Sequence, residues 1–267
     1  MEINKITNAD CIDFMKSMPD DFVDISITSP PYNMGNRVKD WLQTYKVNND
    51  DCMNKDEYFK WISDVIKEIQ RVTKYHIFFN IQEVQGNKGI IAHIFKEFES
   101  SIKEVFIWAK TNPPSHIIPT QCSNGYEYIF CISKDNPEKK MFSYCNFDNH
   151  KGDWIKNILI EGVNRTKNGH NYEFPKWLPR YFIKNFSKEG SLIFDCFMGS
   201  GTTAVASKEL NRKYIGCDIC QDYVDIANKR LQQNTLFDLM QPLDVKQEGG
   251  NGLPPTDKSV GIRPTIL

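Results

Sequence analysis

The segment from Asp195 to Thr203 combines an acid, two glycines and two hydroxyl residues in a spacing that suits a nucleoside ligand. It reads Asp-Cys-Phe-Met-Gly-Ser-Gly-Thr-Thr and lies between a predicted strand and a predicted helix. Gly199 and Gly201 let the backbone approach a ligand closely, and the start of the helix offers unpaired N–H groups. Asp218 follows 23 residues after Asp195, a spacing typical of a carboxylate that binds ribose hydroxyls.

Three classes of cofactor compete for this loop. A nucleotide phosphate site would place a lysine after the second glycine, and none follows Gly201. A dinucleotide site would carry a third glycine where this chain has Ala204, although that position sometimes accepts alanine. The Asp195 carboxylate would repel a pyrophosphate, whereas it can help to hold the cationic methionine end of S-adenosylmethionine. The loop therefore favours S-adenosylmethionine, with a purely structural glycine turn as the alternative.

A second motif, Ser29-Pro30-Pro31-Tyr32, follows another predicted strand. The exocyclic amine of a nucleobase is a poor nucleophile because its lone pair is delocalised into the ring. A site that accepts hydrogen bonds from both amine protons can turn that lone pair toward a methyl group. The Ser29 side chain and the Pro30 carbonyl are suited to be these acceptors, and Tyr32 would stack on a flipped base. The alternative is a proline turn with a buried tyrosine.

Hydrophobic periodicity indicates the elements that position both motifs. Strands are predicted at residues 22–28, 76–80, 105–109, 126–132, 191–195 and 213–218. Helices are predicted at residues 56–73, 88–99, 175–186, 201–210 and 221–234. This alternation predicts an α/β fold with a parallel or mixed sheet covered by helices on both faces. Both motifs follow strands, so we expect them at one carboxyl edge, where α/β proteins bind ligands.

The composition of the 267 residues is that of an ordinary globular protein, with 40% hydrophobic and 25% charged residues. Because the net charge is −1, any phosphate-binding surface must be a local patch. No run of about 18 apolar residues occurs, so we expect a cytoplasmic protein without a membrane segment. Cys217 and Cys220 form a lone C-x-x-C, which predicts no metal site.

The two motifs, in this order, resemble the amino-methyltransferases of bacterial restriction–modification systems. Ser29 to Tyr32 resembles their catalytic S/D/N-P-P-Y motif, and Asp195 to Thr203 resembles their D-x-F-x-G-x-G-T-T donor motif. The catalytic motif precedes the donor motif, as in the circularly permuted beta class of that family. The resemblance implies a Rossmann-like, mostly parallel sheet of the S-adenosylmethionine-dependent methyltransferase type. It also implies a site-specific enzyme that methylates double-stranded DNA.

The same resemblance implies the residues of each site. The catalytic residues are Ser29, Pro30, Pro31 and Tyr32. The cofactor-binding residues are Asp10, Cys11, Phe174, Asp195, Phe197, Gly199, Ser200, Gly201, Thr202 and Asp218. Among these, Asp10 and Cys11 would contact the adenine of the cofactor, Asp218 its ribose, and Phe174 its methionine end. No metal is implied.

The resemblance further implies a catalytic domain over residues 1–235 and a target-recognition insert at about 134–172, where the apolar rhythm fades into an irregular stretch. Residues 241–267 are expected to be a disordered tail. Candidate DNA contacts in the insert are Lys139, Lys140, Lys151, Arg165 and Lys167, although an ordinary solvated surface explains them as well. The block at residues 124–127 resembles a family segment near the base pocket.

The identity of the methylated base is a finer expectation. Within the family, serine at the first motif position leans toward cytosine N4, as Ser29 does here, and aspartate leans toward adenine N6. Asn33 after the tyrosine is common among the adenine enzymes too, so adenine N6 is the alternative. Methylation at cytosine C5 is disfavoured because it needs a thiolate, typically in a Pro-Cys dipeptide, and the sequence has none.

Three rival functions stay open at this point. They are methylation of RNA or of a protein amide, non-catalytic DNA binding, and a nucleotide-dependent oxidoreductase. The order of the motifs and the insert argue against the first, and the intact cofactor residues argue against the second, whereas absence of nicotinamide binding would exclude the third. The resemblance also suggests a cognate restriction endonuclease as a functional partner, a homodimer, and the cytoplasm of a bacterium, an archaeon or a phage-infected cell.

Overall fold

The computed structural model describes residues 1–34, 53–113, 122–136, 138–146, 155–163 and 175–240. Its strands are β1 (Lys5–Asn8), β2 (Val23–Thr28), β3 (Thr73–Ile81), β4 (Ile102–Lys110), β5 (Tyr126–Ser133), β6 (Ile158–Glu161), β7 (Leu192–Asp195) and β8 (Lys213–Asp218). Its α-helices are α1 (Cys11–Lys16), α2 (Lys55–Val72), α3 (Ile90–Phe98), α4 (Trp177–Phe186), α5 (Thr202–Glu209) and α6 (Gln221–Met240).

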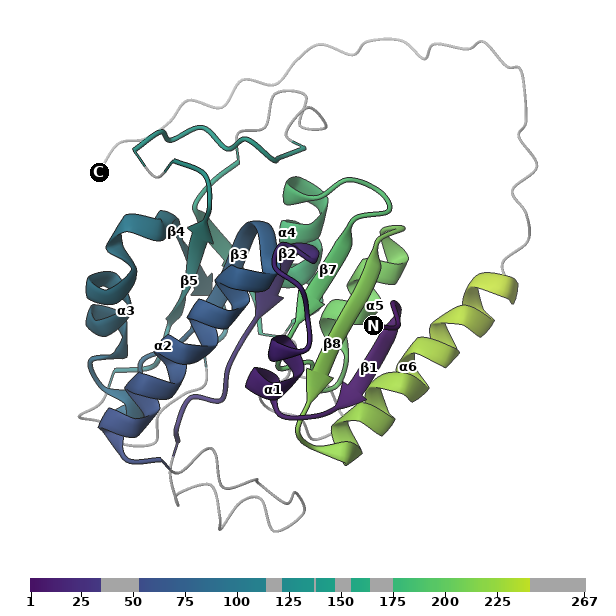
Figure 1. Cartoon of the computed structure of the whole chain (residues 1–267), viewed down its shortest axis with the longest axis horizontal. Helices are drawn as coiled ribbons and strands as arrows, with labels where there is room; N and C mark the ends of the chain where they lie inside the picture. The colour runs from purple at the N-terminus through teal and green to yellow at the C-terminus, as the bar shows by residue number, and fades with distance from the viewer. Residues whose placement is uncertain (35–52, 114–121, 137, 147–154, 164–174, 241–267) are drawn as a thin grey trace, which may run out of the picture.

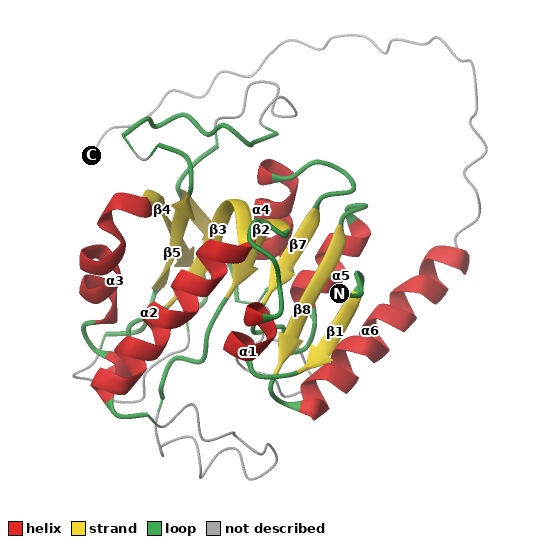
Figure 2. Ribbon diagram, viewed as in Figure 1, coloured by secondary structure: helices red, strands yellow, loops and turns green. Residues whose placement is uncertain are grey.

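The described strands form one eight-stranded sheet in the order β1-β8-β7-β2-β3-β5-β4-β6 (Figure 1). Neighbouring strands run parallel except around β5, which is antiparallel to both β3 and β4. Helices α1, α2 and α3 pack on one face, and α4 and α5 pack on the other (Figure 2). The predicted α/β fold with a mixed sheet covered on both faces is therefore confirmed.

The central strands are almost wholly buried because helices cover both faces of the sheet. In β2, five of the six residues are buried, and in β7 all four are, the pattern expected for parallel strands between two helical layers. Helix α2 instead buries one stripe of its surface. Its N-terminus is capped by Asn54, whose side chain accepts a hydrogen bond from the Glu57 amide. These features explain why sequence periodicity locates β2, β7 and α2 within a few residues.

Three short elements were not predicted. Strand β1 buries only Ile6, and strand β6 buries only Leu159. A four-residue strand with one inward side chain has no detectable period, so pairing with a neighbour creates it: β1 pairs with β8, and β6 with β4. Helix α1 buries Cys11, Phe14 and Met15, but its six residues make fewer than two turns, too short a stretch to reveal a helical period. The prediction of a wholly irregular insert at 134–172 is therefore wrong at residues 158–161.

No helix within the described part of the chain is both long enough and apolar enough to cross a membrane. Cys217 lies buried inside β8 and donates its thiol hydrogen to the Cys196 carbonyl. Within the described residues, no group of three histidine, cysteine or acidic side chains is arranged to hold a metal ion. Cys217 therefore belongs to the core.

Candidate active site

The two sequence motifs meet at the carboxyl edge of the sheet. Strands β2 and β7 are parallel neighbours, with Ser26 opposite Phe194. At their ends, the Thr28 hydroxyl donates a hydrogen bond of 2.6 Å to the Asp195 carboxylate. Thr28 directly precedes the Ser29-Pro30-Pro31-Tyr32 turn, and Asp195 opens the glycine loop. The expectation that both motifs share one edge is therefore confirmed.

Asp195 fastens the glycine loop to the sheet. Its side chain is only 4% exposed, and its oxygens accept hydrogen bonds from the Thr28 hydroxyl, the Phe197 amide and the Thr203 hydroxyl. Burial raises the pKa of the Asp195 carboxyl to about 6, against the lowering effect of these hydrogen bonds. Its carboxylate lies beneath the glycine loop in the interior, and its oxygens already accept hydrogen bonds from the protein itself.

The loop needs glycine for two separate reasons. Gly199 and Gly201 have φ angles of 51° and 84°, a left-handed conformation that side chains rarely adopt. A Cβ atom at Gly201 would also lie 2.7 Å from the Cβ of Ala227 on α6. The close approach of α6 therefore fixes the shape of the loop at the start of α5.

Asp218, at the end of β8, holds the other side of the loop. Its carboxylate accepts the Gly199 amide at 2.8 Å and the Cys220 amide at 2.9 Å. Burial raises its pKa above the usual range. A carboxylate has about four acceptor positions, so two remain for hydroxyl donors of a ligand.

Asp10 lies on the neighbouring strand end. It caps α1 by accepting the Ile12 and Asp13 amides through one oxygen, Oδ1, and β1 pairs with β8 so that Asn8 is opposite Asp218. Cys11 beside it is buried. Phe174, which is also expected in the cofactor set, lies outside the described residues.

These groups fit an adenosyl sulfonium. Acids at 10, 195 and 218 stand at the ends of three strands that lie side by side in the sheet. Two of them keep acceptor positions for hydroxyl or amine donors, and the negative charge of all three opposes a phosphate group. Glycines at the start of α5 leave the backbone accessible. The donor set therefore suits S-adenosylmethionine better than a nucleotide.

The proline turn carries a polar network at the same edge. The Tyr32 hydroxyl donates to Glu127 at 2.8 Å and lies 3.0 Å from the Ser29 hydroxyl. The amide nitrogen of Asn80 donates to Tyr32 and to Glu127, each at 2.7 Å. Lys110 pairs with Glu127 at 2.6 Å. Burial, and then the Glu127 charge, raise the pKa of Tyr32 well above its usual value, so the phenol stays protonated.

Sequence reasoning missed two members of this network, Asn80 and Lys110. Asn80 ends a run of apolar residues in β3 and is 1% exposed. A polar residue at the carboxyl end of a buried strand was the available signal, because that edge binds ligands in α/β folds. Lys110 ends β4 and gave no such signal. Glu127 belongs to the block that the family resemblance had placed near the base pocket.

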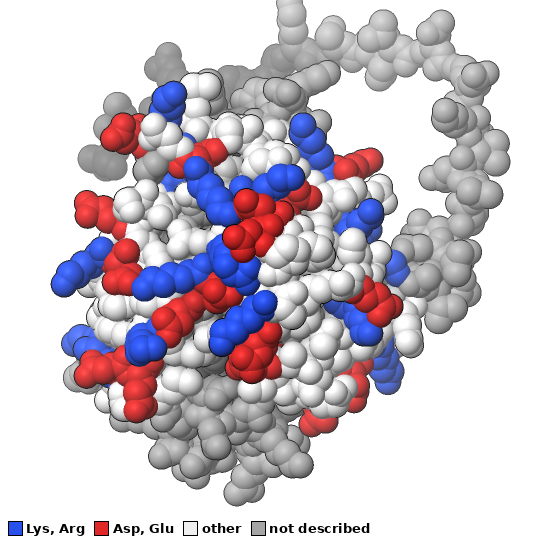
Figure 3. All heavy atoms as spheres, viewed as in Figure 1, with Lys and Arg blue, Asp and Glu red and all other residues white. Residues whose placement is uncertain are grey.

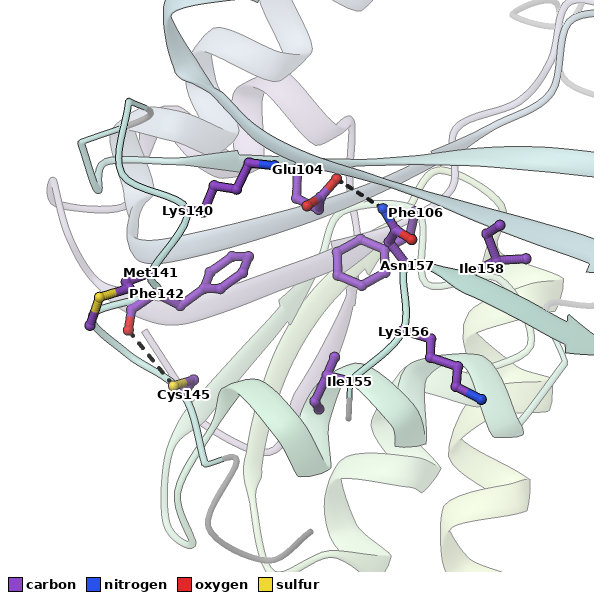
Figure 4. Close-up of a pocket in the computed structure, with 10 residues that line it drawn as sticks. All are labelled: Glu104, Phe106, Lys140, Met141, Phe142, Cys145, Ile155, Lys156, Asn157 and Ile158. Atoms are coloured by element: carbon purple, nitrogen blue, oxygen red, sulfur yellow. Dashed lines mark hydrogen bonds between the residues drawn. The ribbon is translucent and has the colours of Figure 1, made fainter. Parts of the chain in front are cut away.

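The expected DNA contacts are not gathered at this edge. Lys139 and Lys140 follow β5, whose last residue, Ser133, pairs with His76 near the start of β3. They therefore lie toward the edge opposite the two motifs. Lys140 lines a cavity of about 780 Å³ beside β4 and β6 (Figure 4), which no residue of either motif lines. The other three, Lys151, Arg165 and Lys167, lie outside the described residues.

The face formed by α2 and α3 is an ordinary charged surface. Basic and acidic side chains alternate across it (Figure 3), and Lys60–Asp64 and Lys67–Glu97 form ion pairs. Such exposed pairs leave little net positive field for a phosphate backbone.

Comparison with known proteins agrees with this geometry. The type II methyltransferase M.HinfI of Haemophilus influenzae is 28% identical over 251 residues, covering 86% of this chain and 69% of the relative. The type II methyltransferase M.BglII of Bacillus subtilis is 29% identical, covering 84% of this chain and 68% of the relative.

Two solved structures share the fold. The cytosine-N4-specific PvuII DNA methyltransferase matches with a TM-score of 0.63 at 15% identity, covering 91% of this chain and 89% of that one. The M1.HpyAVI complex with SAM matches with a TM-score of 0.58 at 21% identity, covering 85% and 98%. The N6/N4 methyltransferase family model, described as DNA methylase, matches residues 23–229, so this chain belongs to that family of DNA amino-methyltransferases.

Proposed function

We propose that the chain transfers a methyl group from S-adenosylmethionine to the exocyclic amine of one base within a specific sequence of double-stranded DNA. Cytosine N4 is the favoured acceptor, and adenine N6 is the alternative. The observation that carries the proposal is the hydrogen bond between Thr28 and Asp195. It joins the turn that suits an amine to the loop that suits a methyl donor, so the two substrates would meet over one strand boundary.

On the cofactor side, Asp218 would accept the ribose hydroxyls, and Asp10 with Cys11 would contact the adenine. Residues 197–202 would lie along the methionine end, which Phe174 would close, and the buried Asp195 would act through its charge. Bound S-adenosylmethionine would supply an electrophilic methyl group on a sulfonium. The residues around it position that methyl group, so their contribution to the rate is mainly one of orientation.

On the base side, Ser29 and the Pro30 carbonyl would accept the two hydrogens of the amine, and the ring of Tyr32 would stack on the flipped base. Pro31 would keep the turn rigid. Serine at the first motif position supports cytosine N4. No covalent intermediate with the protein would be required, because the amine would attack the methyl carbon directly while the bond from that carbon to sulfur breaks, leaving S-adenosylhomocysteine and releasing one amine proton to solvent.

For the rest of the chain, we propose that residues 1–235 form the catalytic domain and that the insert at about 134–172 reads the DNA sequence. Strand β6 ends with Glu161, which pairs with Lys110 at the edge of the two motifs. Arg165 follows four residues later in the sequence. Arg165, Lys167 and Lys151 lie outside the described residues and are proposed as DNA contacts from the family resemblance. Lys139 and Lys140, near the opposite edge, are the weakest members of the set.

The remaining partners follow from the reaction. A methyltransferase of this kind would protect DNA from a cognate restriction endonuclease and would work in the cytoplasm, where its DNA substrate is. A homodimer is the quaternary state proposed for it.

The direct test is methyl transfer from tritiated S-adenosylmethionine to unmethylated duplex DNA, RNA and protein, followed by sequencing that identifies each modified base. N4-methylcytosine within one short sequence is the expected result, and N6-methyladenine would select the alternative. Transfer to RNA or protein but not to DNA would overturn the proposal.

A further inference from the structure

A network of five side chains lies along the same edge of the sheet, across four neighbouring strands. Ser29 and Tyr32 follow β2, Asn80 lies near the end of β3, Glu127 near the start of β5, and Lys110 at the end of β4. The carboxylate of Glu127 is at its centre. One of its oxygens pairs with the Lys110 ammonium, and the other accepts hydrogen bonds from Tyr32 and Asn80.

The direction of each hydrogen in this network is determined by chemistry. An ammonium and an amide nitrogen only donate, and an ionised carboxylate only accepts. The single hydrogen of the Tyr32 hydroxyl therefore goes to Glu127 at 2.8 Å. The Asn80 amide nitrogen donates its two hydrogens to its two closest acceptors, Tyr32 and Glu127, both at 2.7 Å. Ser29 is farther away, at 3.3 Å.

The Ser29 hydroxyl is the last member of the chain. It lies 3.0 Å from the Tyr32 hydroxyl, whose hydrogen is already committed to Glu127. Ser29 must therefore donate its own hydrogen to Tyr32. Its Oγ atom is left with lone pairs only, which is the state needed to accept a hydrogen from an exocyclic amine.

Burial keeps these directions fixed. Glu127 is 7% exposed and Asn80 is 1% exposed, so water offers little competition for their hydrogens, and hydrogen bonds are stronger in such a medium. The Lys110 side chain is equally covered and supplies the opposite charge. A buried carboxylate without such a partner would be strongly disfavoured.

We infer that Glu127, held by Lys110 and Asn80, is a positioning residue that acts through Tyr32 to make Ser29 a pure acceptor for the target amine. This inference rests on the proposed function. It assigns Tyr32 a second role besides stacking. Because its hydroxyl donates to Glu127, the same hydroxyl can only accept from Ser29. Glu127 itself need not touch the base.

The Glu127→Gln substitution would disturb the hydrogen-bond directions of the network while keeping the shape of the side chain. If its amide oxygen faced Tyr32, its NH₂ group would face the Lys110 ammonium; if it turned over, its NH₂ would face two donors. Removing Lys110 as well resolves this conflict, because the amide oxygen can then accept from Tyr32 and Asn80. The double variant Lys110→Met/Glu127→Gln should therefore recover activity that Glu127→Gln alone loses.

The experiment measures the single-turnover rate of methyl transfer to duplex DNA and the dissociation constants of S-adenosylmethionine and DNA. Glu127→Gln and Tyr32→Phe should each lower the rate by about 10- to 100-fold, and Lys110→Met/Glu127→Gln should be about 10-fold faster than Glu127→Gln. Both dissociation constants should stay near those of the wild type for Glu127→Gln. Glu99→Gln, an exposed glutamate, and Tyr75→Phe, at the far end of β3, are the controls.

Wild-type rates in both Glu127→Gln and Tyr32→Phe would overturn the inference, as would a double variant no faster than Glu127→Gln. The Tyr32→Phe variant keeps the ring and its packing, so it carries the test if Glu127→Gln fails to fold. A wild-type protein that transfers no methyl group to DNA would overturn the proposed function, and this inference with it.

Discussion

The Tyr58 hydroxyl on α2 donates a hydrogen bond of 2.7 Å to the carbonyl oxygen of Pro31. Tyr58 is completely buried, and α2 is held on the sheet by the apolar stripe that includes it. Because prolines offer no N–H groups, a turn that contains two of them has few ways to attach itself to the protein. This bond links the turn to α2, the longest of the three helices α1, α2 and α3 that pack on one face of the sheet.

Tyr58→Phe should therefore loosen the turn. We expect the free energy of unfolding to fall by about 1–3 kcal/mol, the cost of leaving a carbonyl without its donor. Methyl transfer should slow by about 10-fold, since Ser29 is two residues away. Urea unfolding and single-turnover kinetics measure the two effects. Tyr181→Phe removes another tyrosine–carbonyl bond, an exposed one of 3.1 Å to Lys156, and should leave the transfer rate unchanged.

Gly201→Ala should damage the cofactor loop. The new Cβ would clash with Ala227 at a residue whose φ is already positive, so we expect a loss of about 2–4 kcal/mol in stability. Calorimetry should show at least about 10-fold weaker binding of S-adenosylmethionine. Gly190→Ala is the matched control, because Gly190 has a φ of 79° but open space around its Cβ position. Equal losses in both variants would mean that backbone strain, not the clash, dominates.

Asp218→Asn should weaken the donor site by a different route. One end of the new amide would point an N–H group at the Gly199 or the Cys220 amide, each of which now donates to the carboxylate. We expect the dissociation constant of S-adenosylmethionine to rise by about 10- to 100-fold. Asp222→Asn, an exposed change on α6, should leave it unaltered. Unchanged binding in Asp218→Asn would remove Asp218 from the site.

Asp195 should make stability depend on pH. Its folded pKa is about 6, above the usual 3.8, so the folded state binds the proton more tightly than the unfolded chain does. This contribution is fully present below about pH 4 and is lost as the pH rises through 6. Relative to Asp195→Asn, the wild type should gain on the order of 3 kcal/mol between pH 7 and pH 4. Urea titrations at several pH values measure this, and a constant difference would contradict it.

The extent to which the sequence predicts the fold depends on how much of each element is buried. Strand β7 was located because three of its four residues are apolar, and β2 because its apolar residues alternate with small or polar ones. Strand β6 was missed because only Leu159 points inward, and its existence depends on pairing with β4. Periodicity also could not show that β5 runs antiparallel, since strand direction is a property of the pairing.

The candidate site likewise has a part that the sequence predicts and a part that only strand pairing creates. The loop from Asp195 and the turn from Ser29 are continuous in sequence, so their residue types and spacing were visible at once. The contact between Glu127 and Lys110 is not local: it requires β4 and β5 to pair so that Ala109 lies opposite Tyr126. Asn80 joins them through the pairing of β3 with β5. Nothing in the linear order of these residues brings them together.

The pairing of β1 with β8 affects the order in which the enzyme is assembled. The side chain of Asn8 binds the Asp218 carbonyl across a sequence separation of 210 residues. A ribosome that adds about 5–20 residues per second makes β8 roughly 10–40 seconds after β1. During that interval β1 has no partner strand, and α1 has no neighbouring acid at position 218. The pocket for the methyl donor is thus completed late in translation, only after β8 has been made.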